Sequence, residues 1–400
     1  MRHLLLCTML LTYVLFHSFA SEANAEELPH INGESAILID ATTGTILYEK
    51  NANLPMYPAS ITKIATGIYA IENGNPEDIV TVSKNARYVD GTRVYLGEGE
   101  QVPLRKLEYG LLMHSGNDAA IAIAEHMEGS EAQFAEKLNQ YLVEKTGVEK
   151  THFTNPHGLH DDNHYTTASD MAKIARYAMK NETFRTIVGT LKLPWDGKEW
   201  KSELNNHNKL LRDYEGATGI KNGFTDQAMH TLVGSAKRGD TEFIAVTMKT
   251  STSAQAYKDV GTLLDYGFAN YETKLATKEG TTYQAQGTKE TYLVDEDLYV
   301  TAPLGSSVTT DVTQTGQLIV TAGNKQYEFM LTPKFKPTAP KPAEATTSTE
   351  AISSSKAPYY ALFAAWLLLN ATLVLYVFTR RSRRQRKASA KNVYRRMGQP

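Results

Sequence analysis

Cysteine is the residue that this sequence lacks most clearly, since the 400 residues contain only Cys7. Cys7 lies in a segment that we expect to be removed from the mature protein, so no disulfide can stabilise the folded chain. A catalytic thiol is excluded for the same reason. The fold must therefore depend on a hydrophobic core, for which a chain of this length is sufficient.

Acidic residues are absent from the C-terminal segment 380–400, which contains nine Lys and Arg residues. Subtracting these nine positive charges from the formal net charge of −2 leaves −11 for the rest of the chain. An acidic body with a basic end does not offer the surface that a phosphate backbone requires. We therefore expect no nucleic acid partner.

Charged residues are also absent from 359–379, an apolar run with tyrosines near both ends. In a helix that rises 1.5 Å per residue, such a run spans roughly 31 Å, about the thickness of the bilayer hydrocarbon. Six Lys or Arg residues follow at 380–387, and positive charge marks the cytoplasmic side. We predict one transmembrane helix at 359–379, with a basic cytoplasmic tail at 380–400.

Residues 1–25 have the pattern of a secretory signal peptide. Arg2 and His3 precede an apolar stretch at 4–16, and Ala23-Asn24-Ala25 provides the small residues of a cleavage site. The apolar stretch is too short to span a bilayer. This leader agrees with the orientation deduced from the tail, and the two predict a single-pass cell-membrane protein whose body lies outside the cytoplasm.

The remaining chain has the pattern of two folded parts and a linker. Residues 26–272 mix helical runs with strand pairs such as 231–236 and 242–248, which predicts an α+β fold with an antiparallel sheet flanked by helices. Residues 273–333 contain short alternating runs, among them 291–302, and Gly323-Asn324 is a two-residue hairpin signal. These features are typical of a small all-β domain. Residues 334–358 are rich in Pro, Ala, Ser and Thr and form the predicted linker to the membrane.

Helix ends can also be predicted from the residues that cap them. We expect one helix to begin at Ser60 and to end at Asn73-Gly74, with a left-handed glycine. Asn117 or Asp118 would be the N-cap of a later helix, and Thr167 the N-cap of another.

Ser60 and Lys63 are the first candidate catalytic residues. They lie one helical turn apart, so the ammonium nitrogen can reach the hydroxyl. A lysine whose pKa is lowered by burial can take the proton of a serine nucleophile. The pattern alone is weak, because an N-cap serine and a solvated lysine would look the same. Indeed, Ser-x-x-Lys recurs at 353–356 in the predicted linker.

Two further polar motifs favour the catalytic interpretation of Ser60 and Lys63: Ser115-Gly-Asn117 and Lys221-Asn222-Gly223. Together with Ser60-Ile-Thr-Lys63, with 35–44 and with Asn155-Pro-His-Gly-Leu159, they resemble the serine D-alanyl-D-alanine carboxypeptidases, the low-molecular-mass penicillin-binding proteins. The resemblance covers about residues 30–270 and implies a β-lactamase/transpeptidase-like fold. It also implies a cell-wall hydrolase that acts on peptidoglycan stem peptides and is acylated by β-lactam antibiotics.

The resemblance also implies roles for particular residues. Ser60 would be the nucleophile, Lys63 its base, and Ser115 the group that passes a proton to the leaving amine. The expected substrate-binding residues are Asn117, Lys221, Asn222, Gly223, Phe224 and Thr225, with the backbone N–H groups of Ser60 and Phe224 as the oxyanion hole. No metal or other cofactor is implied.

One residue departs from the family pattern, because Asn222 stands where the family usually has a threonine or serine. That hydroxyl helps to bind the substrate's carboxylate. The amide of Asn222 has an NH₂ group that can donate instead, but the side chain is larger. A slow enzyme, or a protein that binds peptidoglycan or penicillin without turnover, is therefore the second interpretation.

Two other enzyme classes remain open. A β-lactamase would share these motifs, but we find no clear carboxylate for deacylation between Asn117 and Lys221. A metal hydrolase is suggested by a polar cluster in one loop, although its spacings fit no usual zinc pattern. The members of that cluster are His152, His157, His160, Asp161, Asp162 and His164.

Overall fold

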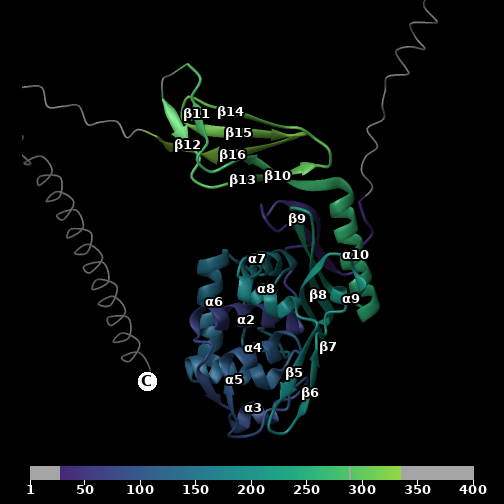
Figure 1. The fold of residues 1–400 in the computed structure, drawn as a ribbon. Helices are drawn as coiled ribbons and strands as arrows, with labels where there is room; N and C mark the ends of the chain where they lie inside the picture. The colour runs from purple at the N-terminus through teal and green to yellow at the C-terminus, as the bar shows by residue number, and fades with distance from the viewer. Residues whose placement is uncertain (1–27, 288–289, 335–400) are drawn as a thin grey trace, which may run out of the picture. The chain divides into compact units, whose positions relative to one another are not determined.

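The structure is a computed structural model that describes residues 28–287 and 290–334. Five antiparallel strands form its central sheet, in the order β2-β1-β9-β8-β7. Figure 1 labels β9, β8 and β7 of this sheet. Their bounds are β1 Ser35–Asp40, β2 Ile46–Lys50, β7 Ala217–Thr225, β8 Met229–Arg238 and β9 Thr241–Thr250. β7 stands at one edge of the sheet, where an extended peptide can add as a further strand.

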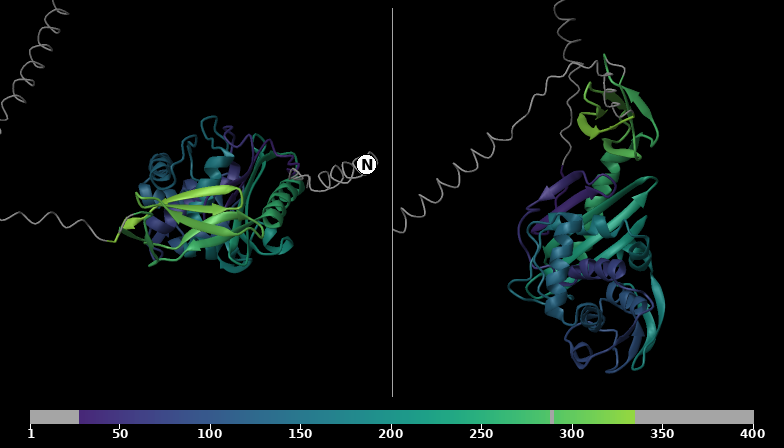
Figure 2. Two further views of the ribbon diagram at one scale, coloured as in Figure 1. Left: turned by 90° about the horizontal axis from the view of Figure 1, so that it is seen from above. Right: turned by 90° about the vertical axis from the view of Figure 1, so that its left-hand side faces the viewer.

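Both faces of this sheet are buried, because successive side chains of a strand point to opposite sides. Ile37 and Ile39 pack into a large cluster with the helices between residues 63 and 189, whereas Ala36 and Leu38 pack with α10. Figure 1 labels the two sets of helices, and Figure 2 shows α10, in green, against the teal strands. The helices are η1 Ala59–Thr62, α2 Lys63–Asn73, α3 Lys84–Tyr88, α4 Leu104–Leu112, α5 Asn117–Glu128, α6 Glu131–Thr146, α7 Ala168–Ala178, α8 Glu182–Gly189, α9 Leu210–Asp213 and α10 Ser253–Asn270.

Two small antiparallel pairs of strands accompany the helical layer: β3 Ile79–Thr81 with β4 Gln101–Pro103, and β5 Lys192–Asp196 with β6 Lys201–Asn205. The described residues beyond α10, 271–287 and 290–334, form an all-β region that has an apolar cluster of its own. Its strands are β10 Tyr271–Thr277, β11 Thr282–Gln284, β12 Thr291–Leu293, β13 Leu298–Pro303, β14 Val308–Val312, β15 Gln317–Ala322, β16 Lys325–Met330 and β17 Thr332–Pro333. The buried carboxylate of Asp40 accepts hydrogen bonds from Thr273 and Thr301 in this region, at 2.7 and 2.9 Å.

The α+β architecture and its antiparallel sheet confirm the prediction from the sequence. The expected hairpins are present, and Gly323-Asn324 joins β15 to β16 with Ala322 opposite Lys325. The predicted run at 291–302 is two strands rather than one, because the acidic residues at 295–297 interrupt it.

Four of the predicted helix ends can be tested. Thr167 is confirmed, since its side chain accepts the Asp170 N–H. The predicted start at Ser60 falls in the short 3-10 helix η1, and α2 begins only at Lys63. Gly74 is extended, with φ −99°, so the predicted left-handed stop is wrong. Glycine is needed there for space, because a Cβ atom would lie 2.4 Å from Leu104. The N-cap of α5 is Gly116, so the prediction of a side-chain cap at Asn117 or Asp118 is also wrong. Both of those side chains bind groups outside their helix, as described below.

Among residues 28–287 and 290–334, we find no helix that is long and apolar enough to cross a membrane. The predicted signal peptide, the span at 359–379, the basic tail and nearly all of the linker lie outside the described residues. They stay predictions.

Candidate active site

Ser60 lies in the short 3-10 turn η1, directly before α2, rather than in the α-helix itself. The preceding residue, Ala59, has φ +51°, which turns the chain sharply at this point. The loop at 154–159 packs closely on this turn, since a Cβ atom at Gly158 would lie 2.0 Å from the Ala59 carbonyl oxygen. Gly158 itself has φ +83°, so only glycine permits this approach without strain.

Lys63 begins α2 and is fully buried. Its Nζ atom donates to Ser60 Oγ at 3.0 Å and to Asn117 Oδ1 at 2.7 Å. A third bond, of 2.6 Å, reaches the backbone oxygen of His157. The structure therefore brings Ser60 and Lys63 together with Asn117 and the His157 backbone, from three segments that are far apart in the sequence.

The surroundings of Lys63 favour its neutral form. Burial lowers the pKa of Lys63 well below its ordinary value, and the nearby positive charge of Lys221 lowers it further. Asp118 opposes this shift. At a given pH, a larger fraction of such a lysine is neutral, and so available as a base, than of an exposed lysine.

Asn117 reaches the site from the first turn of α5, and Ser115 lies two residues earlier, in the segment that leads into this helix. Asn117 Nδ2 donates to the Asp90 backbone oxygen at 2.7 Å while Oδ1 accepts from Lys63, so both ends of the amide are fixed. Ser115 is buried and has φ +65°, an unusual conformation for serine. Asp118 holds the loop before β4, because its carboxylate accepts the N–H groups of Val94 and Leu96.

The third motif lies on the edge strand β7. A Cβ atom at Gly223 would come within 2.7 Å of the Ser60 backbone nitrogen, so this strand passes directly beside Ser60. Lys221 is buried, and burial lowers its pKa to about 7. Phe224 is 55% exposed, whereas the Thr225 hydroxyl accepts the N–H of Ala228 and so closes the turn to β8.

Asn222 differs from its neighbours in one respect. Its Oδ1 atom is buried and accepts no hydrogen bond. An unpaired acceptor is unfavourable beside a carboxylate, but rotating the amide would present its NH₂ group there. The structure thus places the departure from the family pattern on the strand that passes Ser60.

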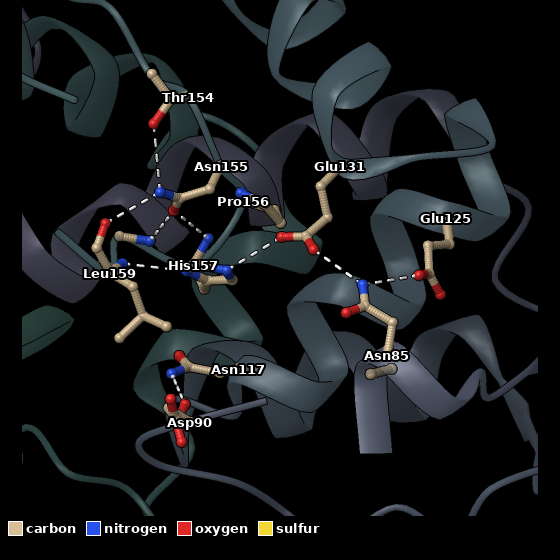
Figure 3. Close-up of polar contacts among 12 residues, drawn as sticks. Asn85, Asp90, Asn117, Glu125, Glu131, Thr154, Asn155, Pro156, His157 and Leu159 are labelled. Atoms are coloured by element: carbon tan, nitrogen blue, oxygen red, sulfur yellow. Dashed lines mark hydrogen bonds and ion pairs between the residues drawn. The ribbon is translucent and has the colours of Figure 1, made fainter. Parts of the chain in front are cut away.

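Several residues of this site were not predicted from the sequence. The rings of His114 and His207 lie with their centroids 4.5 Å apart and are tilted by 52° to each other. Burial and the charge of Lys221 lower the pKa of both. The only sequence signal was that His114 directly precedes Ser115. The interaction of His157 with Glu131, shown in Figure 3, had no signal at all, because 26 residues separate the two.

The histidines of the loop at 152–164 contact different groups and do not face one common point. His164 Nε2 lies 2.8 Å from Thr62 Oγ1 and its Nδ1 accepts the Thr154 N–H, while burial lowers its pKa to about 3. His160 faces Asp162, and His152 lies by the Asn163 backbone oxygen. In the part of the chain that the structure describes, no three His, Cys, Asp or Glu side chains converge as a metal ion would require.

Fold and site together define a class: α+β proteins in which a serine and a buried lysine meet beside the edge strand of an antiparallel sheet. The family model described as D-alanyl-D-alanine carboxypeptidase, Peptidase_S11, matches residues 22–252. The chain belongs to this family of serine hydrolases.

Individual relatives agree with this assignment. The chain is 37% identical to the D-alanyl-D-alanine carboxypeptidase DacF of Bacillus subtilis over 281 residues, which are 68% of this chain and 71% of DacF. It is 33% identical to DacA of Escherichia coli, over 74% of this chain and 79% of DacA. Among solved structures, penicillin binding protein 5 from Haemophilus influenzae is similar with a TM-score of 0.69 and 28% identity, over 77% of this chain and 98% of that one.

Proposed function

We propose that this protein is a serine carboxypeptidase that removes the terminal D-Ala from peptidoglycan stem peptides through an acyl-enzyme on Ser60. The observation that carries the proposal is the 3.0 Å contact between Lys63 Nζ and Ser60 Oγ, made by a buried lysine. Family membership supports the substrate class, because the relatives named above are D-alanyl-D-alanine carboxypeptidases.

The reaction would begin when Lys63 takes the Ser60 proton and Ser60 Oγ attacks the carbonyl carbon between the two D-Ala residues. The backbone N–H groups of Ser60 and Phe224 would stabilise the oxyanion. The bond to the leaving D-Ala then breaks, and the proton held by Lys63 reaches the amine through Ser115. Water attacks the resulting ester and releases the shortened peptide, which returns Ser60 to its free form.

Substrate binding would follow from β7. Its free edge can pair with an extended peptide, and Lys221 at the same edge supplies positive charge for the terminal carboxylate. Since the carboxylate lies at Lys221 and the scissile carbonyl at Ser60, the peptide would run antiparallel to β7. Penicillin would enter the same groove and acylate the same serine.

The proposal is tested with residues 26–332, which lack the predicted signal peptide and membrane span. Incubation with a D-Ala-D-Ala peptide should release D-Ala, and incubation with penicillin should add one adduct per chain by intact mass. Both signals should be absent from Ser60→Ala. An adduct that persists in this variant would show that another residue is the nucleophile.

A second candidate function is supported by the unpaired Oδ1 atom of Asn222. If the carboxylate is poorly held, the protein would be acylated by penicillin or bind stem peptides with little turnover. Stoichiometric acylation without D-Ala release would favour this function over the carboxypeptidase. Fast hydrolysis of nitrocefin would instead indicate a β-lactamase.

We also propose that the protein is held at the cell membrane by residues 359–379, with its body outside. The support is the absence of charge in this run and the six basic residues after it. A chain that ends at Thr332 should be secreted in soluble form. Recovery of that truncated mature protein from a carbonate-washed membrane would reveal another anchor.

A further inference from the structure

The Lys63 amine has a geometry that decides where its lone pair points. A neutral amine has two N–H donors and one lone pair, whereas three oxygens surround Lys63 Nζ. If Asn117 Oδ1 and the His157 backbone oxygen accept the two N–H groups, the lone pair faces Ser60 Oγ. Correct placement of the His157 carbonyl is therefore needed to aim the base.

The side chain of His157 helps to hold this carbonyl in place. Its Nδ1 atom accepts the Leu159 N–H at 3.1 Å, and the Asn155 side chain accepts the Gly158 N–H at 2.7 Å. Because Nδ1 is an acceptor, the ring proton is on Nε2. The ring thus has a defined tautomer, and Nε2–H requires an acceptor of its own, since His157 is only 6% exposed.

Glu131 supplies that acceptor. Its Oε2 atom lies 3.1 Å from His157 Nε2, and its Oε1 atom accepts from Asn85 at 3.0 Å (Figure 3). Glu131 is the first residue of α6, where the positive end of the helix favours a carboxylate. Asn85 also donates to Glu125, at 3.1 Å. The carboxylate is therefore fixed by groups from outside the loop that it supports.

We propose that Glu131 is a positioning residue for the catalytic base: by accepting the His157 Nε2–H it fixes the ring, and with it the carbonyl that orients Lys63 toward Ser60. This inference rests on the proposed function, because it assumes that Lys63 deprotonates Ser60. It assigns an effect on the reaction to a side chain that touches neither substrate nor nucleophile.

The test compares three variants by their second-order rate of acylation by penicillin. Glu131→Ala removes the acceptor and should slow acylation by about 10-fold, since misplacing a catalytic group by 1 Å can cost about 100-fold. Glu131→Gln keeps an oxygen that can accept from Nε2–H, so it should recover most of the rate. Glu125→Ala is the matched control, because it also removes a partner of Asn85 but does not reach His157; it should acylate like the wild type.

The pH profile separates positioning from a loss of folding. When the carbonyl moves away from Lys63 Nζ, the ammonium form loses an acceptor and the pKa of Lys63 falls. The other charged or titratable groups that interact with Lys63 and do not contact Glu131, namely Lys221, Asp118, His164 and His207, are unchanged in all three variants. The acidic limb of the acylation rate should therefore move to lower pH in Glu131→Ala, while the adduct still reaches one per chain.

Each outcome supports or overturns the proposal. A wild-type rate in Glu131→Ala, an equal loss in Glu131→Ala and Glu125→Ala, or a Glu131→Gln variant as slow as Glu131→Ala would overturn it. If Glu131→Ala does not fold, ¹⁵N NMR of the wild-type imidazole decides: the Nε2–H form of His157 supports the proposal, and the Nδ1–H form overturns it. If wild-type Ser60 is not acylated at all, the proposed function fails, whereas the NMR result still reports on the contact with Glu131.

Discussion

The body of the protein, residues 28–270, and the all-β region after α10, residues 271–334, bury different kinds of side chain. The body buries two lysines and several carboxylates, among them Lys63, Lys221, Asp118 and Asp40. Among the described residues of 271–334, the buried polar side chains are threonines, and the cluster at the centre is aliphatic with one tyrosine. Burying charge is costly unless it is paired or neutralised. Under the proposed function, the burial of Lys63 and Lys221 would lower the stability of the body at the site of the chemistry, and the described part of the all-β region has no buried lysine.

Lys63→Ala should produce the largest effect. It removes the only base within reach in the first motif, and a positioned acid or base contributes about 10²–10⁴-fold to rate. We expect penicillin acylation of Ser60 to slow by that factor, measured by time-resolved intact mass. Lys173→Ala, at a partly exposed lysine of α7, is the control. A Lys63→Ala variant that acylates at a similar rate would mean that the burial of Lys63 serves no catalytic purpose.

Lys221→Met tests how much the second buried lysine contributes to activity and how much its burial lowers stability. A hydrogen bond to a charged group contributes about 1.5–3 kcal/mol, so D-Ala release should fall about 10- to 100-fold. The melting temperature should rise, because an apolar side chain of similar length replaces a buried ammonium group.

The pH dependence of that stabilisation has a definite sign. Burial lowers the pKa of Lys221 to about 7 in the folded protein. Between this value and the ordinary lysine pKa, the unfolded chain binds one more proton than the folded chain. The free-energy cost of burying Lys221 is therefore largest below pH 7 and disappears as pH rises. The advantage of Lys221→Met over wild type should therefore shrink from pH 7 to pH 10, as measured by thermal unfolding. An advantage that does not change with pH would contradict this account.

Leu318→Ala tests the stability of the all-β region. Leu318 is fully buried in the cluster of the all-β region, and such truncations cost about 2–5 kcal/mol. We expect the free energy of unfolding of this region to fall by that amount, as measured by its proteolysis at increasing denaturant concentration. The rate of Ser60 acylation should stay at its wild-type value. Met330→Ala, at a side chain that is 74% exposed, should leave both unchanged. A slower acylation in Leu318→Ala would show that the two regions are energetically linked.

Asn222→Thr should give the smallest effect. A hydroxyl would replace an amide whose oxygen is unpaired, and we expect kcat/KM for a D-Ala-D-Ala peptide to rise by up to about 10-fold. Penicillin acylation should change less if its carboxylate lies differently in the groove. If the threonine variant is slower than wild type, Asn222 is adapted to this site.

The sequence alone determined those features that depend on neighbours in the chain. Alternating and helical patterns predicted the α+β fold, and the turn at Gly323-Asn324 was confirmed, because local backbone preferences decide both. The three polar motifs also identified the family, and Ser60 and Lys63 are in contact as their spacing requires.

Only the tertiary structure decided how the polar side chains are used. Gly74 and Asp118 matched local capping patterns, yet Gly74 makes room for Leu104 and Asp118 holds the loop before β4. Likewise, the sequence indicates only that Glu131 is an acidic residue in the first turn of a helix, whereas in the folded chain it contacts His157. The physical reason is that a buried donor or acceptor must find a partner wherever the fold supplies one, and packing between distant segments, not local sequence, brings that partner within reach.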